Sequence, residues 1–313
     1  MRFITLTLLA QLASELGIGL DQVRRTVKLF DEGNTLPFIA RYRKEVTGGL
    51  DEEQLRRLEE RLGYLRNLEA RKEEVLRSIA EQGKLTPELE QAIRAATIRQ
   101  EVEDYYRPYR PKRRTRATKA KEQGLEPLAA LIWAQEMTAG DPEEVATAYL
   151  RPELGVEEPE QALAGALDII AEQIADQAEW RRMIRDYLWE HAQLASELKT
   201  EGPEAQVYRQ YHQYSEPVKR IPPHRVLALN RGEKEGALKV GLQVDQAPLL
   251  SRLEELVLKN RSCIFTPYLE AAVEDSLNRL ILPSIEREIR AALTETAEEQ
   301  AIRVFGINLR QLL

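Results

Sequence analysis

Residues 51–83 are DEEQLRRLEERLGYLRNLEARKEEVLRSIAEQG, and they carry the clearest structural signal in the chain. Their main apolar positions are Leu55, Leu58, Leu62, Leu65, Val75, Leu76 and Ile79. Because most of these positions step by three and four, they fall on one face of a helix. Asp51 is a candidate N-cap, Gln54 can complete a capping box, and Gly83 ends the pattern. The stretch therefore predicts one long amphipathic helix.

Helix signals lie on both sides of this stretch. Residues 21–32 are periodic and end at Gly33, and Pro37 can open a short helix. Thr86 and Asp141 are each followed by proline, which is the chemistry of a helix start. We therefore expect helices throughout the first half of the chain.

Two longer regions continue the helical pattern. Residues 159–199 contain no proline after the first and only Gly165 as an interruption, so they predict a long helix or a pair joined by a small bend. Residues 266–313 predict a last helical region, which Pro283 should kink.

Two short segments depart from this pattern. Val226–Leu229 and Ala237–Val244 are rich in apolar and branched residues, and NRGEKEG at 230–236 favours a turn between them. The glycines of that turn do not match a phosphate loop, because the Gly-Lys-Ser/Thr ending is missing. We therefore expect one β-hairpin in an otherwise helical chain.

The predicted fold class is mainly α, a helical array of several subdomains with long central helices and one small β-hairpin. A parallel α/β enzyme would need strands alternating with helices, and these are missing. A chain of 313 residues exceeds what one hydrophobic core usually serves. We place the subdomains at 1–105 (N-terminal helices), 106–212 (a basic Tyr/Pro-rich segment and central helices), 213–260 (the hairpin region) and 261–313 (C-terminal helices).

Composition limits the kind of protein this is. A net charge of −7 argues against a protein that coats nucleic acid over its whole surface, so any polyanion contact must be local. The single cysteine, Cys263, excludes a disulfide framework and a zinc site built on cysteine pairs, and fits a reducing cytoplasm. The opening run Met1–Ala10 lacks a clean signal-peptide cleavage site, and no run approaches the roughly 20 apolar residues of a membrane span. We expect a cytoplasmic protein without membrane contact.

No catalytic residue, metal site or cofactor is predicted. His191, His212 and His224 are far apart and fall into no metal-ligand spacing. The 52 Asp and Glu residues are expected as solvated helix faces, so their pairs nominate no acid and base. We therefore expect a protein that is not an enzyme.

The segment 105–121, YYRPYRPKRRTRATKAK, reverses the charge of the chain, with eight basic residues and no acidic one. The basic residues are Arg107, Arg110, Lys112, Arg113, Arg114, Arg116, Lys119 and Lys121. Arginine offers paired donors to phosphate, and Tyr105, Tyr106 and Tyr109 could stack on unpaired bases. Equally, the arginines could pair with acidic helices while the tyrosines pack a joint between subdomains. A smaller cluster, Arg41, Tyr42, Arg43 and Lys44, carries the same two interpretations, with packing the favoured one.

Residues 31–52, DEGNTLPFIARYRKEVTGGLDE, resemble the signature stretch of the Tex family of bacterial transcription accessory proteins. Residues 103–115, EDYYRPYRPKRRT, are similar to its Tyr-Pro-basic segment, and GLEPL at 124–128 follows in the family's order. Residues 214–240, YSEPVKRIPPHRVLALNRGEKEGALKV, resemble its central hairpin region, and 283–313 resemble the helix that leads out of it.

The resemblance implies a helical N-terminal region with a helix-turn-helix-like unit and a long central helix. In the family, a RuvC-like domain of nuclease fold, helix-hairpin-helix units and an OB-fold RNA-binding domain follow, so we expect this chain to be a shortened form. The family is also similar to the core of a eukaryotic elongation factor that handles histones. The chain departs from the family at Tyr106 and Arg107, where members are more often apolar, and at Gly306 in a helix usually free of glycine.

The leading functional hypothesis is a non-catalytic scaffold of a transcription accessory protein that contacts RNA or DNA weakly and without sequence preference. The alternative is a protein-interaction module that docks on the transcription machinery without touching nucleic acid. A helical hydrolase is disfavoured, because no nucleophile, base and orienting group can be assembled from the sequence.

Overall fold

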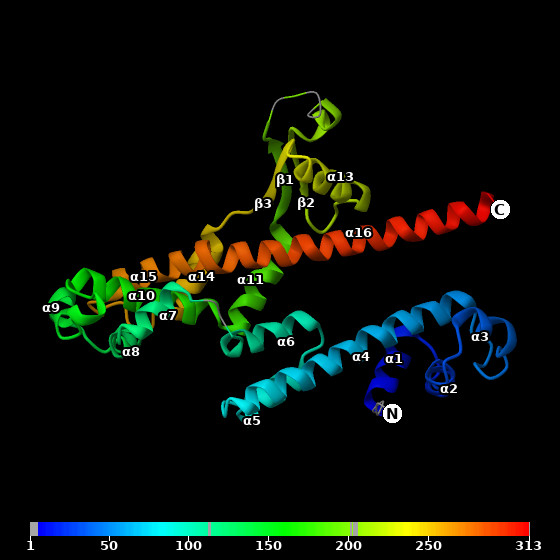
Figure 1. The fold of residues 1–313 in the computed structure, drawn as a ribbon, viewed down its shortest axis with the longest axis horizontal. Helices are drawn as coiled ribbons and strands as arrows, with labels where there is room; N and C mark the ends of the chain where they lie inside the picture. The colour runs from blue at the N-terminus through cyan, green and yellow to red at the C-terminus, as the bar shows by residue number, and fades with distance from the viewer. Residues whose placement is uncertain (1–5, 112–113, 201, 203–205, 313) are drawn as a thin grey trace. The chain divides into compact units, whose positions relative to one another are not determined.

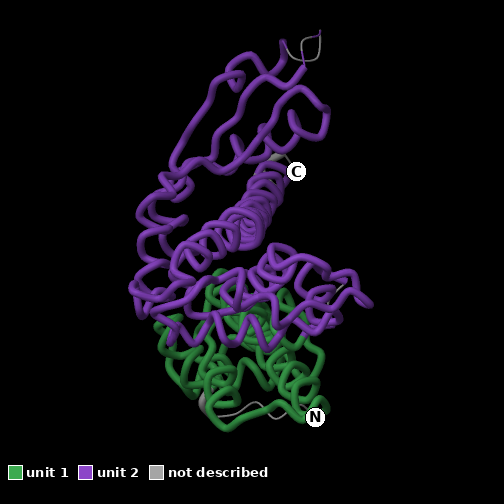
Figure 2. Tube along the Cα trace, turned by 90° about the vertical axis from the view of Figure 1, so that its left-hand side faces the viewer, with its two compact units in different colours: residues 1–109 green, residues 110–313 purple. Residues whose placement is uncertain are grey.

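The structure is a computed structural model of the chain and describes residues 6–111, 114–200, 202 and 206–312. It divides into two compact units, residues 1–109 and residues 110–313 (Figure 2). Helices dominate both units (Figure 1), which confirms the predicted mainly α class. None of the helices within the described ranges is both long and apolar enough to cross a membrane.

The first unit is built on one long helix. Its helices are α1 (Leu6–Leu16), α2 (Leu20–Asp31), α3 (Leu36–Tyr42), α4 (Glu52–Glu81), α5 (Pro87–Ala95) and α6 (Arg99–Tyr106), followed by a 3-10 turn at Arg107–Tyr109. Helix α4 confirms the prediction for residues 51–83. Asp51 Oδ1 accepts the backbone N–H of Gln54 at 2.8 Å, and Gln54 Oε1 accepts that of Asp51 at 3.0 Å. This capping box satisfies two backbone donors at the start of the helix.

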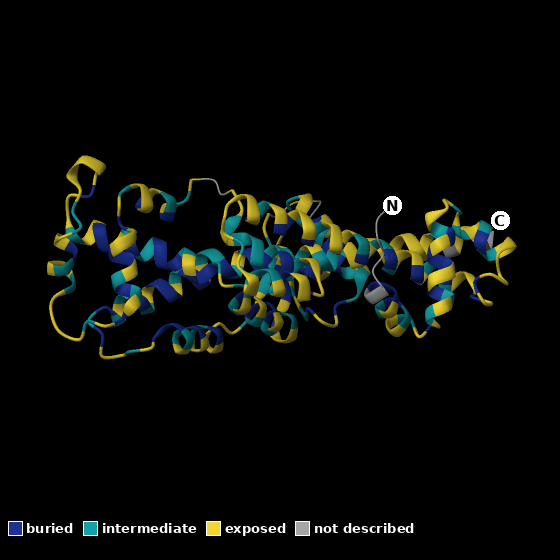
Figure 3. Cartoon of the chain, turned by 90° about the horizontal axis from the view of Figure 1, so that it is seen from below, coloured by how far each residue is buried: buried dark blue, intermediate teal, exposed yellow. Residues whose placement is uncertain are grey.

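The apolar stripe of α4 forms the core of the first unit. All seven positions of the predicted stripe are buried. The other five helices of the unit each pack against α4 or one another, and Figure 3 shows buried positions alternating with exposed ones along the helices. Burying a leucine side chain stabilises a fold by roughly 1.5–3 kcal/mol, so this stripe is a main source of the unit's stability.

Polar contacts tie α4 to its neighbours. Arg61 binds Glu15 of α1 through hydrogen bonds of 2.6 and 3.0 Å. Lys72 is buried, and its Nζ donates to the carbonyl of Arg94 in α5 at 2.9 Å while it pairs with Glu69 at 2.8 Å. A cation at the end of α5 is favourable, because the last carbonyls of a helix carry partial negative charge.

Several helices of the second unit pack around α10. Its helices are α7 (Arg116–Glu122), α8 (Glu126–Ala134), α9 (Pro142–Thr147), α10 (Pro159–Ala175), α11 (Ala178–His191), α13 (Pro223–Lys234), α14 (Ala247–Val257), α15 (Thr266–Asp275) and α16 (Leu282–Leu312), with 3-10 turns at Pro152–Leu154 and Arg209–Tyr211. Helices α7, α8, α9 and α15 all contact α10. A Cβ at Gly165 would lie 2.4 Å from Leu125 Cδ1, so glycine allows this close approach. A π-helical turn, Ser276–Ile281, ends two residues before Pro283, the residue at which we expected a kink.

A small antiparallel sheet completes the second unit. Its strands are β1 (Gln193–Leu198), β2 (Gln213–Pro217) and β3 (Leu238–Gln243), in the order β2-β1-β3. Ala195 in the central strand lies opposite Ser215 on one side and Gly241 on the other. Helix α13 packs against β3 and against α16. Their shared core contains Leu229, Leu238 and Ala297.

Helix α16 also covers the outer edge of β3. The side chain of Glu286 accepts the backbone N–H of Leu242 at 3.2 Å, and Arg290 donates to the carbonyl of Val240 at 3.2 Å. These two contacts satisfy backbone groups that an edge strand would otherwise leave open.

The predicted β-hairpin is correct only in its second strand, since Ala237–Val244 contains β3. Val226–Leu229 lies inside α13, and β3 pairs with β1, which lies much earlier in the chain. Gly232 is a helical residue at which a Cβ would lie 2.6 Å from Leu238 Cδ1. Gly232 therefore allows α13 to pack closely on β3. The sequence pattern had suggested a turn at this position.

The prediction for residues 159–199 is correct for its first part only. The region forms a helix pair, α10 and α11, but the pair breaks at Asp176–Gln177 and not at Gly165. Residues 193–198 form strand β1. The strand escaped prediction because it is short, its buried residues do not alternate with exposed ones, and it follows directly after a helix.

Candidate nucleic-acid interface

The basic segment 105–121 is divided between the two units. Its tyrosines close the first unit, in α6 and the 3-10 turn after it, whereas the residues from Arg110 onward open the second unit. The segment is therefore not a single structural element, and its two parts are described separately.

The three tyrosines of the segment pack against the core of the first unit. Tyr105, Tyr106 and Tyr109 are all half-buried. The hydroxyl of Tyr106 shares a hydrogen bond of 3.0 Å with Ser78 Oγ. The guanidinium of Arg71 lies 5.3 Å from the centre of the Tyr106 ring. These contacts anchor the end of the unit to α4, and stacking of the rings on bases stays a prediction.

The basic side chains of the second unit lie on its surface. Arg110, Arg114, Arg116, Lys119 and Lys121 are exposed, whereas Arg107 at the end of the first unit is half-buried. Lys112 and Arg113, also predicted to bind, lie outside the described residues. The structure thus places a run of cations where a polyanion can reach them.

Helix α7 explains why these cations face outward. Thr115 Oγ1 accepts the backbone N–H of Thr118 at 3.0 Å and caps the helix start. Ala117 and Ala120 are buried, and α7 packs on α10. The small buried side chains form the inner face of α7, so the long basic side chains between them project into solvent.

Two of these cations have carboxylate partners, but the pairs are weak. Arg114 lies 2.6 Å from Glu122, with side chains that are 70% and 51% exposed. Lys121 lies 3.8 Å from Glu126 in a similarly exposed pair. Exposed ion pairs contribute about 1 kcal/mol or less, so a phosphate can compete for these cations.

Arg116 lies near an internal acidic group. Burial raises the pKa of Asp168 in α10, and the guanidinium groups of Arg279 and Arg116 act against that rise. Arg279 binds Asp168 at 3.1 Å and also pairs with Asp275. Arg116 is therefore partly engaged by the framework, and the remaining cations of α7 are the freer phosphate ligands.

The smaller basic cluster lies at the end of α3 in the first unit. Arg41, Tyr42, Arg43 and Lys44 are all exposed. Packing was the favoured interpretation of this cluster, yet Tyr42 is 64% exposed.

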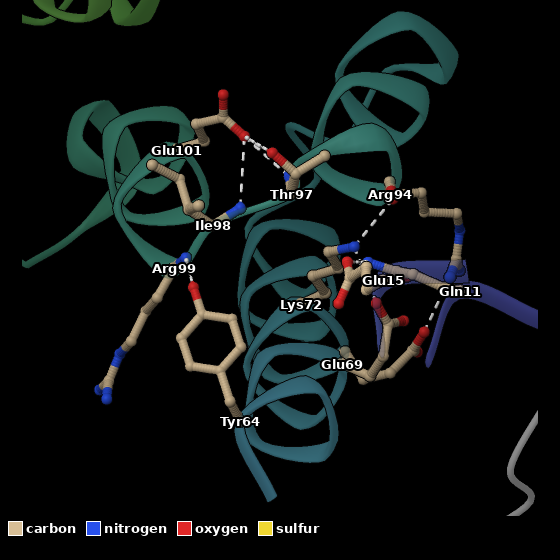
Figure 4. A network of polar contacts seen from close by, with 11 residues as sticks. Gln11, Glu15, Tyr64, Glu69, Lys72, Arg94, Thr97, Ile98, Arg99 and Glu101 are labelled. Carbon is tan, nitrogen blue, oxygen red and sulfur yellow. Dashed lines mark hydrogen bonds and ion pairs between the residues drawn. The ribbon is translucent and has the colours of Figure 1, made fainter. Parts of the chain in front are cut away.

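Sequence reasoning missed a polar network that fixes α6 (Figure 4). Glu101 Oε2 accepts hydrogen bonds from the backbone N–H of Thr97 at 2.7 Å and of Ile98 at 3.4 Å. The hydroxyl of Tyr64 in α4 accepts the backbone N–H of Arg99 at 3.4 Å. The available signal was a glutamate three residues after the helix cap, which is half of a capping box.

Among the described residues, no group of three or more His, Cys, Asp and Glu side chains is arranged to hold a metal ion. His191 instead lies against Tyr187, with 4.4 Å between ring centres.

The fold and its surface define a class of protein: a mainly helical region with a net negative charge and a local group of exposed cations at residues 110–121. Two family models match the chain: the Tex-like protein N-terminal domain over residues 6–80, and the Tex central region over residues 138–305. The second model alone covers more than half of the chain, and the chain belongs to the Tex family.

Curated relatives agree with this assignment. The chain is 45% identical over 322 residues to the protein tex of Bordetella pertussis, covering 98% of this chain and 40% of the relative. It is 42% identical over 309 residues to the transcriptional accessory protein Tex of Neisseria gonorrhoeae, covering 96% and 40%. It is 30% identical over 304 residues to the human S1 RNA-binding domain-containing protein 1, covering 92% and 30%. The chain therefore spans well under half the length of these relatives.

Proposed function

We propose that this chain is a scaffold region of a transcription accessory protein and that it contacts nucleic acid through the cations of residues 110–121. The contact is weak, independent of base sequence and sensitive to salt, because exposed cations that bind phosphates release counterions. The observation that carries the proposal is the exposure of five basic side chains over this short segment.

The charge distribution supports this proposal. The chain has a net charge of −7, which repels a polyanion from most of its surface. Residues 105–121 contain no acidic side chain, so they form a local exception. A nucleic acid is thereby guided to one region. The names of the relatives point the same way, since one is called a transcriptional accessory protein and another an S1 RNA-binding domain-containing protein.

The test is a titration of a fluorescent single-stranded oligonucleotide at several salt concentrations. The charge-reversed variant Arg114→Glu with Lys119→Glu removes two exposed cations, one just before the cap of α7 and one within the helix. We expect it to bind more weakly and to reduce the slope of log K against log salt by roughly 1.4, at about 0.7 for each phosphate contact.

The matched control is Lys239→Glu with Arg252→Glu, two exposed cations elsewhere in the second unit. This control changes the net charge by the same amount, so it separates a local site from a general charge effect. Binding that responds equally to both variants, or that is insensitive to salt, would overturn the proposal. Circular dichroism of each variant checks that the fold is retained.

We also infer that this region carries no catalytic centre of its own. The support is the lack of a nucleophile, base and orienting group that the sequence could bring together. Hydrolysis of RNA, single-stranded DNA or nucleoside triphosphate by the purified chain, abolished by substitution of one of its own residues, would refute this inference.

Protein docking is the second candidate function, and exposed apolar side chains on α16 favour it. Ile302 and Phe305 are 72% and 69% exposed, and Leu309 lies one turn further along the same face. Such a stripe suits a partner from the transcription machinery. The test is a pull-down after nuclease treatment that compares the chain with its Phe305→Glu variant. Partners that are lost on nuclease treatment but retained by Phe305→Glu would be bridged by nucleic acid, and this result would contradict the docking function.

A further inference from the structure

A pair of aromatic rings, the half-buried Phe38 and the exposed Tyr42, lies at the end of helix α3. Tyr42 is the last residue of the helix and is 64% exposed. Phe38 lies one turn earlier, with its ring centre 5.3 Å from that of Tyr42 and a tilt of 46° between the rings. The guanidinium of Arg43 lies 5.2 Å from the Phe38 centre. The accessible ring of Tyr42 thus packs against Phe38, and Phe38 in turn lies beside a guanidinium group.

Cations surround this ring pair. Arg41, Arg43 and Lys44 are exposed and form no ion pair with any residue in the described ranges. Several other arginines of the first unit have carboxylate partners, as Arg66 does with Asp31 at 2.6 Å. Between residues 33 and 50 the sequence contains three cations and a single carboxylate, so the local charge is positive. A phosphate would therefore meet these cations without displacing an internal carboxylate.

The backbone after α3 is held in place. Thr47 is buried, and its hydroxyl donates to the carbonyl of Lys44 at 2.9 Å. The side chain of Gln22 in α2 donates to the carbonyl of Gly48 at 2.8 Å. Ile39 of α3 is fully buried. Because the helix end is already ordered, a ligand would bind there with little further loss of backbone entropy.

We propose that Phe38, Arg41, Tyr42, Arg43 and Lys44, here called the α3 platform, bind single-stranded nucleic acid by stacking an unpaired base on Tyr42. The cations contact the flanking phosphates. Stacking tolerates any base, because every base has a flat π-face, whereas a paired base is closed to it. The proposal rests on the proposed function in that the chain meets nucleic acid, but it uses a different surface, in the other unit.

The experiment compares two strands of equal length, oligo(dT) and an abasic oligonucleotide that keeps the phosphates but lacks the bases. The full chain should bind oligo(dT) more tightly than the abasic strand. The Tyr42→Ala variant should bind oligo(dT) about fivefold more weakly, at the lower end of the stacking contribution, and the abasic strand unchanged. Tyr42→Phe keeps a ring and should retain binding. Phe305→Ala removes an equally exposed ring elsewhere and is the matched control.

A spectroscopic signal adds an independent check. The tryptophans of the chain, Trp133, Trp180 and Trp189, all belong to the second unit, so Tyr42→Trp introduces a tryptophan into the first unit. The fluorescence of this added tryptophan is the difference between the emission of the variant and that of the wild-type chain. It should be quenched by oligo(dT) and not by heparin, which has charge but no bases.

The outcomes separate the two proposals. Loss of binding in Arg114→Glu with Lys119→Glu but not in Tyr42→Ala would overturn the α3 platform and leave the proposed function intact. Loss of binding in Tyr42→Ala but not in the charge-reversed variant would overturn the proposed contact through residues 110–121 and leave the α3 platform intact. Equal weakening of both strands in Tyr42→Ala would also overturn the platform, because it would indicate a general effect rather than base stacking.

Discussion

Gln135 and Asn260 hold each other through reciprocal contacts between side chain and backbone. Gln135 Oε1 accepts the backbone N–H of Asn260 at 3.1 Å, and the Gln135 carbonyl accepts a hydrogen bond from Asn260 Nδ2 at 3.0 Å. Gln135 Nε2 also donates to the carbonyl of Val257 at 2.8 Å. The buried glutamine therefore joins the end of α8 to the end of α14 across more than a hundred residues of sequence.

Replacing Gln135 should destabilise the second unit. Gln135→Ala leaves buried backbone groups without their partner, which costs about 1–3 kcal/mol. Its φ of 56° adds strain for alanine, so Gln135→Gly should destabilise less than Gln135→Ala. Urea unfolding measures both. Gln123→Ala, which loses one exposed hydrogen bond, is the control, and equal stability of all three variants would contradict this account.

Two helical glycines should respond to alanine in opposite directions. Gly165→Ala would place its Cβ 2.4 Å from Leu125 Cδ1, and overpacking of this kind costs about 1–3 kcal/mol. At Gly63 in α4 nothing lies within 4 Å of such a Cβ, so Gly63→Ala should gain up to about 1 kcal/mol of helix propensity. Thermal unfolding should therefore shift down for the first variant and up for the second. A rise for Gly165→Ala would show that α7 and α8 do not pack closely on α10.

Glu288 should be important for joining α11 to α16. Arg181 is fully buried and lies 2.7 Å from Glu288, which also binds Arg185 at 3.0 Å. Glu288→Ala leaves buried positive charge without this partner, a loss that costs about 3–5 kcal/mol in buried pairs. Glu299→Ala on the exposed part of α16 is the control. A free energy of unfolding unchanged in Glu288→Ala would argue against the buried pairing.

Tyr214 should couple stability to alkaline pH. Burial, followed by its hydrogen bond to Glu216, raises the pKa of Tyr214 to about 12. An unfolded tyrosine ionises near pH 10. The folded state holds this proton more tightly, so its contribution is fully present below about pH 10 and is lost as pH rises toward 12. The difference in absorbance titration between the wild-type chain and Tyr214→Phe should show one phenol ionising near 12. A difference curve centred near 10 would contradict the assignment.

Much of the helical fold could be predicted from local sequence. Helix α4 was found because seven apolar side chains lie on one face and Asp51 with Gln54 caps it, both of which are properties of neighbouring residues. The sheet could be predicted only in part: the segment 237–244 contains β3, but β1 pairs with strands that lie well after it, and Gly232 is required by packing rather than by a turn.

The candidate interface was only partly predictable for the same reason. Charge in residues 105–121 is visible in the sequence, and the structure places five of the basic side chains at the surface. The attachment of Tyr106 to Ser78 and the proximity of Arg116 to Asp168 are contacts between distant residues. No spacing rule within the segment reveals them, because they depend on how helices far apart in the chain come together.

The covering of β3 by α16 affects how copies of this chain behave at high concentration. An uncovered outer strand is a template onto which another polypeptide can add, and fibrils and swapped dimers grow from such templates. With Val240 and Leu242 already engaged by Arg290 and Glu286, that route is closed along this side of the sheet. On the other side, strand β2 is short and ends in Pro217, which has no N–H to offer an incoming strand.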